Sequence, residues 1–273
     1  MHTICAHLGG SAPKTSSCGI QGGIEQSALF RLGTPEQAEQ ILARFDQGAD
    51  FLYTRFGNPT VEQLAQAIAG LESGADALIT SSGNAAALTA LSIALDGQAH
   101  KSIATHPGLY GGTVELLGIF RDTYGVEIIW ADPTDSANWE AAISRASVVF
   151  IETPSNPLWK LVDLTSAIQT AHQAQTTVIV DNPVATPFNQ QPLQLGADWV
   201  IHSTSKFLNG HSDAIGGAIV SRQPLTARQR SIHRNLGATV NALDAWLILR
   251  GMRSFALRME AHNRNGQILA SWL

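Results

Sequence analysis

The sequence predicts an α/β fold in which a mostly parallel sheet is covered by helices on both faces. The chain has 273 residues, of which 44% are hydrophobic and 14% charged, and this is enough for a sizeable core in one large domain. Between residues 77 and 221, short apolar and β-branched segments alternate with segments of helical spacing, which is the pattern of a buried parallel sheet. The seven predicted strands are Ala77–Thr80, Ser102–Thr105, Glu127–Ala131, Val148–Glu152, Thr177–Asp181, Trp199–His202 and Ala214–Ser221.

Helices are predicted before and between these strands. Asn58 can cap a first helix and Pro59 can take its first position, with Gly70 and Gly74 near its end. Apolar residues with helical spacing then predict the helices Asn84–Leu95, Thr113–Tyr124, Asn138–Ser144 and Leu164–Ala174.

Residues 1–58 form a separate region that is predicted to be largely irregular. A short helix is expected from Pro35 to about Phe45, but the glycine-rich remainder has little core of its own. We expect this arm to pack on another surface, of which a neighbouring subunit is one candidate.

The bulk properties exclude several classes of protein. A net charge of −5 and a pI near 6.0 give no basic footprint for nucleic acid. Neither a signal peptide nor a membrane span is recognised, so we expect a cytoplasmic protein. Cys5 and Cys18 lack CxxC spacing and are expected to be reduced thiols. The nine histidines contain no HExxH motif, and no metal site is predicted.

The carboxyl ends of the strands are where ligands bind in such a sheet. The first strand runs into Ser81-Ser82-Gly83-Asn84, where a helix begins, and the free amides near Gly83 and Asn84 can hold a phosphate. A simple helix cap is the alternative. No GxGxxG or GxxxxGK[ST] motif is present, which disfavours a dinucleotide or nucleoside triphosphate.

Lys206 follows an apolar strand instead of lying on a charged helix face, with Ser203 and Ser205 beside it. We expect this lysine to be partly desolvated, which favours the free amine that attacks an aldehyde. The two hydroxyls can donate to a phosphate. A lysine whose charged end simply reaches water is the alternative.

Asp181 ends the predicted strand Thr177–Asp181 after an apolar run. A carboxylate there is costly unless it pairs with a cation, and the protonated ring nitrogen of pyridoxal phosphate (PLP) is such a cation. An aspartate that caps the next turn is the alternative. Lysine, aspartate and a phosphate cradle at three strand ends together indicate a PLP site.

From Tyr53 onward the chain resembles the Cys/Met-metabolism PLP-dependent enzymes of fold type I, the PLP-dependent transferase fold. This family includes cystathionine γ-synthase, the cystathionine lyases, methionine γ-lyase and the O-acylhomoserine sulfhydrylases. The matching blocks, in order, are YTRFGNPT at 53, SSGNAAA at 81, LYGGT at 109, ETPSNP at 152, VDNP at 180, HSTSKFLNGHSDAIGG at 202 and DAWLILRGMRSFALRM at 244.

The resemblance implies a role for each matching residue. Lys206 is similar to the Schiff-base lysine that also transfers protons, and Asp181 to the partner of the pyridine nitrogen. Tyr110 resembles the tyrosine that stacks on the cofactor ring and assists proton transfer. The phosphate would be held by Ser203 and Ser205, and by the backbone amides of Gly83 and Asn84, the latter standing where the family commonly has Met.

Three further residues are implied. Asn156 would reach the ring hydroxyl, although Asn before Pro is also a routine turn choice. Tyr53 and Arg55 resemble residues that cross to the phosphate of a neighbouring subunit, which requires a dimer or tetramer with shared active sites. Without the resemblance to this family, the sequence indicates only that Arg55 is a charged surface residue.

The implied activity is trans-sulfuration by γ-replacement or γ-elimination on a sulfur amino acid or an O-acylhomoserine. Cystathionine-handling members often have an arginine where this chain has Val114-Glu115-Leu116, and Gly112 replaces the cysteine of methionine γ-lyases. A sulfhydrylase or a broad C–S lyase is therefore favoured.

The predicted organisation is an arm at 1–58, a PLP-binding large domain at 59–253, and the start of a truncated C-terminal domain at 254–273. Family members clamp the substrate carboxylate with an arginine of that domain. Arg250, Arg253 and Arg258 fall in a helix expected to be structural. A truncated, impaired PLP-binding or assembly protein is one alternative, and a nucleotide-binding α/β protein is the other.

Overall fold

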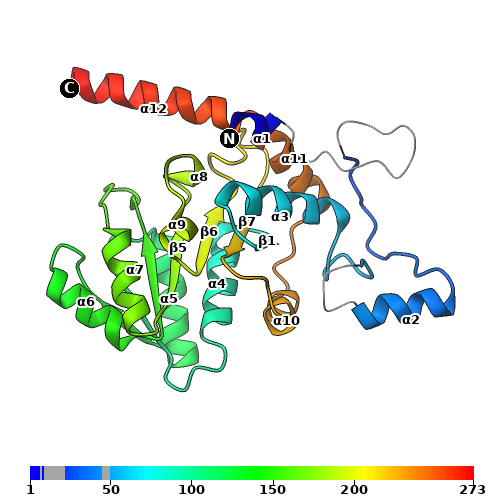
Figure 1. Ribbon diagram of the computed structural model, residues 1–273, viewed down its shortest axis with the longest axis horizontal. Coiled ribbons are helices and arrows are strands. Elements are labelled where there is room, and N and C mark those ends of the chain that lie inside the picture. Colours follow the sequence, from blue (N-terminus) through cyan, green and yellow to red (C-terminus); the bar gives the residue numbers. More distant parts are fainter. Residues whose placement is uncertain (7, 9–21, 45–49) are drawn as a thin grey trace.

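The computed structural model describes residues 1–6, 8, 22–44 and 50–273, and at its centre lies a seven-stranded sheet (Figure 1). The strand order is β1-β7-β6-β5-β4-β2-β3, and all strands run in the same direction except β7, which is antiparallel to β1 and β6. The strands are β1 Asp76–Thr80, β2 Ser102–Thr105, β3 Glu127–Trp130, β4 Val148–Glu152, β5 Thr177–Asp181, β6 Trp199–Ser203 and β7 Gly217–Ser221. The predicted fold class is confirmed, and most strand ends differ by at most one residue.

Two helical layers cover the sheet. Successive strand residues point to opposite faces: Val149 and Ile151 of β4 pack in the core with α3, α6, α7 and α11, whereas Val148 and Phe150 pack with α4 and α5. Both faces are therefore buried, as continuous apolar strands require. The helices in question are α3 Pro59–Glu72, α4 Gly83–Ala94, α5 Gly111–Tyr124, α6 Ser136–Arg145, α7 Leu164–Gln173 and α11 Ala242–Met252.

The first long helix begins as the sequence predicts. Asn58 is the N-cap of α3, and its side chain accepts hydrogen bonds from the amides of Thr60 and Val61, while Pro59 takes the first helical position. The other helices, some of which the periodicity did not reveal, are α1 His2–Ala6, α2 Pro35–Arg44, α8 Thr186–Asn189, α9 Pro192–Leu195, α10 Ala227–Leu236 and α12 Phe255–Trp272. The predicted end of the Pro35 helix near Phe45 lies outside the described residues.

Two described residues of the N-terminal arm contact the α11 region of the same chain. The indole of Trp246 donates to the Gly22 carbonyl at 3.1 Å, and the guanidinium of Arg253 donates to the Leu8 carbonyl. Cys5 carries a free, buried thiol, and Cys18 lies outside the described residues. An additional contact with a neighbouring subunit remains a prediction.

Helix α12 extends past α1 and away from the sheet (Figure 1). Its buried residues are Phe255, Ala256 and Met259, all in the first two turns. In the described part of the chain, no helix combines the length and apolar character needed to cross a bilayer. The predicted domain boundaries lie near the starts of α3 and α12, and the division itself remains a prediction.

Candidate active site

A cavity of about 790 Å³ opens at the carboxyl ends of β4, β5 and β6, which is the edge of an open α/β sheet where ligands bind. Its volume is typical of a small-molecule site. Eight of the ten residues predicted from the sequence line it: Gly83, Asn84, Tyr110, Asn156, Asp181, Ser203, Ser205 and Lys206.

Lys206 lies in a tight turn just beyond β6. The Lys206 amide donates to the Ser203 carbonyl, and the Gly210 amide donates back to the Lys206 carbonyl at 2.8 Å. We predicted a partly desolvated lysine, but the side chain is exposed at the cavity in the isolated chain. Desolvation of the amine therefore has to come from whatever fills or covers the cavity.

The phosphate cradle predicted from the sequence is assembled from α4 and β6. A Cβ at Gly83 would lie 2.9 Å from Cβ of Ser203, so only glycine lets the N-terminus of α4 approach the end of β6 so closely. The first-turn amides of Gly83 and Asn84 have no acceptor inside the helix, and the Ser203 hydroxyl lies beside them. Ser205 accepts a hydrogen bond from the Gly216 amide at 3.0 Å.

Asp181 ends β5, in register with Glu152 of β4 and Ile201 of β6. Desolvation raises the pKa of the Asp181 carboxyl well above its usual range, and the negative charge of Glu152 raises it further. No cationic side chain in the described part of the chain forms an ion pair with Asp181. This carboxylate therefore favours a cationic ligand group in the cavity.

Glu152 is a site residue that the sequence analysis missed. Its side chain is buried, and its two carboxylate oxygens accept hydrogen bonds from the amides of Tyr110 at 2.6 Å and Asn156 at 2.9 Å. Burial raises the pKa of Glu152, while these two amides lower it. One side chain thus fixes both loops that carry predicted cofactor contacts. The ETPSNP block contained Glu152, but nothing in its spacing indicated its partners.

Arg258 was assigned only a structural helix role, and the structure gives it a specific task. From α12 its guanidinium donates to the carbonyls of Phe207, Leu208 and Asn209, at 2.7, 3.2 and 3.3 Å, and it also lines the cavity. Desolvation lowers the pKa of Arg258. Arg258 therefore holds the segment that immediately follows Lys206.

Tyr53 and Arg55 do not line the cavity of their own chain. The Arg55 guanidinium donates to the Arg234 carbonyl at 3.1 Å and lies 4.4 Å from the ring centroid of Phe56. Tyr53 is exposed beside it. The structure thus separates these two residues from the other eight.

Two departures from the family pattern contact each other. The Asn84 side chain donates to the Gly112 carbonyl at 3.2 Å, and a Cβ at Gly112 would lie 2.7 Å from a ring carbon of Tyr110. Any side chain at position 112 would consequently displace the Tyr110 ring or Asn84. Gly112 therefore leaves room for the Tyr110 ring, and the Asn84 side chain binds the Gly112 carbonyl.

The residues present fit PLP. The cavity has an unpaired desolvated carboxylate for the ring nitrogen, a helix N-terminus with a nearby hydroxyl for the phosphate, and a lysine for the aldehyde. Among the described residues, no group of three or more His, Cys, Asp or Glu side chains is placed to hold a metal ion. A lysine and an acidic partner for the pyridinium are the protein groups that characterise PLP-dependent enzymes.

The comparisons with known proteins agree with this class. The chain belongs to the Cys/Met metabolism PLP-dependent enzyme family, which matches residues 2–273. It is 37% identical over 254 residues to an L-methionine gamma-lyase of Fusobacterium nucleatum subsp. nucleatum, covering 92% of this chain and 63% of that protein. The chain thus spans less than two thirds of this relative.

Two solved structures show the same fold. Cystathionine gamma synthase from Xanthomonas oryzae pv. oryzae in complex with cystathionine matches with a TM-score of 0.89 and 33% identity, over 100% of this chain and 67% of that one. A putative O-acetylhomoserine (thiol)-lyase from Campylobacter jejuni matches with a TM-score of 0.87 and 29% identity, over 99% and 74% of the two chains. The second contains a lysine joined to a pyridoxyl phosphate.

Proposed function

We propose that this protein is a PLP-dependent trans-sulfuration enzyme that acts on a sulfur amino acid or an O-acylhomoserine by γ-replacement or γ-elimination. The observation that carries the proposal is the convergence of Lys206 and Asp181 on one cavity from two different strand ends. The similarity to a methionine lyase and to a cystathionine synthase supports both reaction types.

Each cavity residue has a binding task in this proposal. The Asp181 carboxylate keeps the ring nitrogen protonated, because a desolvated carboxylate is strongly stabilised by an adjacent positive charge. The amides of Gly83 and Asn84 and the hydroxyls of Ser203 and Ser205 hold the phosphate. Tyr110 stacks on the ring and Asn156 reaches the ring hydroxyl, both in positions set by Glu152.

The chemical task falls mainly to Lys206. PLP, when bound, supplies an electron sink for the negative charge left when an amino acid loses its Cα proton. The Lys206 amine takes up that proton, and the resulting ammonium delivers a proton to the γ-substituent as it leaves; Tyr110, which also lines the cavity, assists these transfers. Arg258 keeps the Lys206 amine close to the cofactor by binding the carbonyls of the three residues that follow Lys206.

The experiment that tests the cofactor part is an absorption spectrum of the full chain with PLP. We expect a band at the edge of the visible range from lysine-bound cofactor, and its complete loss in Lys206→Ala. A band that persists in Lys206→Ala contradicts the assignment of Lys206.

The substrate part is tested by product analysis. The protein with PLP is incubated with methionine, with cystathionine, and with O-acetylhomoserine plus sulfide. Formation of a 2-oxo acid and ammonia indicates elimination, and a new thioether or thiol amino acid indicates replacement. A Lys206-dependent band with no product from any of the three contradicts the enzymatic proposal and favours a PLP-binding protein without turnover.

We further propose a cytoplasmic dimer or tetramer whose active sites are shared, with no nucleic-acid or membrane partner. A free, buried Cys5 thiol suits a reducing compartment. Leu158, Trp159 and Leu161 expose 71%, 65% and 73% of their area in the loop beside Asn156, and exposed apolar patches mark contact surfaces.

In this assembly Tyr53 and Arg55 contribute to the phosphate site of the neighbouring subunit. The guanidinium fork of Arg55 is suited to bidentate binding of a phosphate. Arg55→Ala is expected to weaken PLP binding by about tenfold or more, since charge-assisted hydrogen bonds are worth about 1.5–3 kcal/mol. Unchanged PLP affinity in Arg55→Ala, with only a loss of stability, contradicts the shared site.

A further inference from the structure

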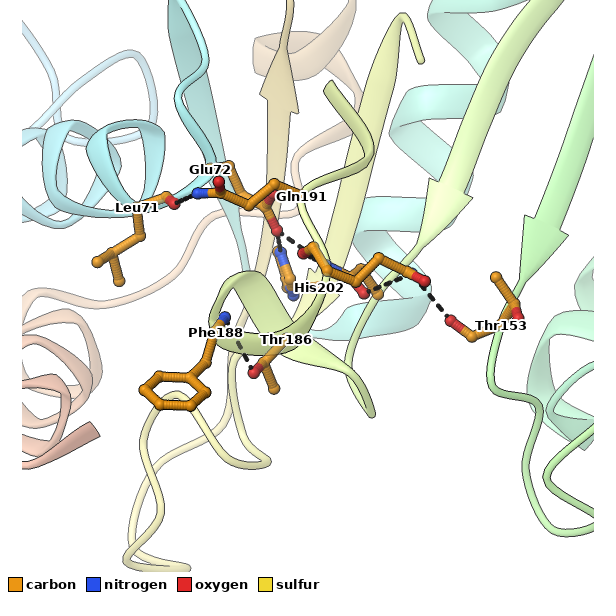
Figure 2. A network of polar contacts seen from close by, with 9 residues as sticks. Leu71, Glu72, Thr153, Thr186, Phe188, Gln191 and His202 are labelled. Carbon is orange, nitrogen blue, oxygen red and sulfur yellow. Dashed lines mark hydrogen bonds and ion pairs between the residues drawn. The ribbon is translucent and has the colours of Figure 1, made fainter. Parts of the chain in front are cut away.

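A fully buried carboxylate and imidazole lie behind the cavity, and the proposed mechanism uses neither. Glu72 is the last residue of α3 and His202 is in β6; both side chains have 0% exposure, and Glu72 Oε1 lies 2.6 Å from His202 Nε2. An ionised carboxylate only accepts hydrogen bonds, so an imidazole that pairs with it carries a proton on Nε2. Figure 2 shows this pair between α3 and the sheet.

The pair belongs to a larger network that joins three strand ends. The Asn182 side chain donates to Glu72 Oε1 at 3.0 Å, and the Gln190 side chain donates to Asn182 Oδ1 at 3.1 Å and to the Thr153 carbonyl at 3.0 Å. Figure 2 displays the links at Thr153 and His202. Through these bonds, the ends of β4, β5 and β6 are tied to one another and to α3.

Each network residue at or just beyond a strand end adjoins a residue of the cavity. Thr153 follows Glu152, Asn182 follows Asp181, and His202 precedes Ser203. A shift of any network member along its strand therefore displaces a cavity residue by a similar distance. Alternating strand residues face opposite sides, so the network holds the strands from behind while the cavity residues face the ligand.

Stability alone gives no reason for this arrangement. Burial of two ionisable groups costs solvation free energy, and their mutual attraction often does not offset this cost. Replacement of such a pair by apolar residues is therefore often neutral or stabilising. In addition, Glu72 Oε2 and His202 Nδ1 are buried without a hydrogen-bond partner among the described residues. The directional bonds instead restrict the relative positions of the strand ends.

We propose that Glu72, His202, Asn182 and Gln190 are positioning residues that set the spacing of Glu152, Asp181 and Ser203 for PLP. This inference rests on the proposed function, because it assigns the network a task in cofactor binding. It requires no contact between the network and the ligand.

The test uses the double variant Glu72→Leu/His202→Leu of the 273-residue chain, which replaces the pair by apolar side chains of similar size. Amide hydrogen exchange of the PLP-free protein is followed in segments 148–156, 177–184 and 199–207. PLP affinity and the pH midpoint of the lysine-bound band are then measured. The matched control is Thr176→Val at the opposite edge of the sheet, where the Thr176 hydroxyl is buried and donates to the carbonyls of Ile143 and Ala146.

We expect the double variant to unfold at the same urea concentration as the wild type or higher. Its amides should exchange faster in all three segments. It should bind PLP about ten- to a hundredfold more weakly, with a shifted pH midpoint of the lysine-bound band. Thr176→Val should lower stability and leave PLP binding unchanged. Wild-type exchange in the three segments, or faster exchange with wild-type PLP binding and midpoint, overturns the proposal.

Two further outcomes have defined meanings. If the double variant does not fold, Gln190→Met replaces it, and wild-type exchange of segments 148–156 and 177–184 in that variant overturns the proposal. If the wild type itself shows no Lys206-dependent PLP band, the proposed function fails. In that case the exchange data alone decide whether the network positions the strand ends.

Discussion

One aspartate lies beside a cavity at the amino ends of the strands and another at their carboxyl ends, and the two aspartates differ in their partners. At the amino edge, beside a cavity of about 350 Å³, Asp198 forms an ion pair with Arg222 at 2.6 Å and accepts from the Val178 amide at 2.9 Å. At the carboxyl edge, Asp181 has no cationic partner in the described residues, and desolvation raises its pKa well above its usual range. The partnered carboxylate is structural, and the unpartnered one lies in the proposed site.

Of the two, the unfavourable charge thus lies at the carboxyl ends of the strands. An unpaired desolvated carboxylate destabilises the ligand-free protein. A cationic ligand group removes this destabilisation when it binds, and its affinity increases accordingly. Asp198 offers no such gain, because its charge is already compensated. A cavity by itself therefore says less about function than the partners of the charges that line it.

The largest effect is expected from a matched pair of substitutions at these aspartates. Asp181→Asn should weaken PLP binding by about 2–5 kcal/mol, because it removes the carboxylate from the proposed charge pair with the ring nitrogen, and this is at least about thirtyfold in Kd. Asp198→Asn should leave PLP affinity unchanged and cost about 1 kcal/mol of stability. Equal effects of the two variants on PLP affinity would remove the distinction between the edges.

A smaller effect is expected at Glu152. Glu152→Gln replaces one acceptor oxygen by an amide that cannot accept, so either the Tyr110 or the Asn156 amide loses its partner at a cost of about 1–3 kcal/mol. PLP affinity, measured by titration, should fall by about tenfold. The control is Glu127→Gln on the exposed edge strand β3, and this substitution should leave PLP affinity unchanged. Wild-type affinity in Glu152→Gln would show that the two loops are positioned by other contacts.

The smallest effect is the pH dependence of stability without PLP. The Asp181 pKa in the folded protein lies above its ordinary value near 3.8, so the unfolded chain releases this proton first. The contribution of Asp181 to the free energy of unfolding should therefore be fully present below pH 3.8 and should be lost as the pH rises through the folded-state pKa. Glu152, whose pKa is also raised by burial, acts in the same direction.

Urea titrations of wild type and Asp181→Asn across this pH range measure that contribution. The variant should show a flatter decline, because its amide does not titrate. Parallel curves would mean that the Asp181 carboxyl is not desolvated in the folded protein.

Most of the sheet could be placed from the sequence because its signals are local, and eight of the ten residues assigned from strand ends or from the family resemblance line one cavity. Asn58-Pro59 marks the start of α3 within its own turn, and β5 reads as an apolar run that ends in Asp181. Glu152, Arg258 and the Glu72–His202 pair gave no such signal. Their partners lie 42, 51 and 130 residues away along the chain.

The sequence by itself determined which residue types end each strand, and with them the lysine, the carboxylate and the phosphate cradle. Only the tertiary structure decided that these strand ends share one cavity, that Asp181 has no cation while Asp198 has one, and that Lys206 is exposed. The physical reason is that the apolar pattern of a strand or helix repeats within two to four residues and can be read locally. The energy of a buried charge depends on groups that folding brings from distant parts of the chain.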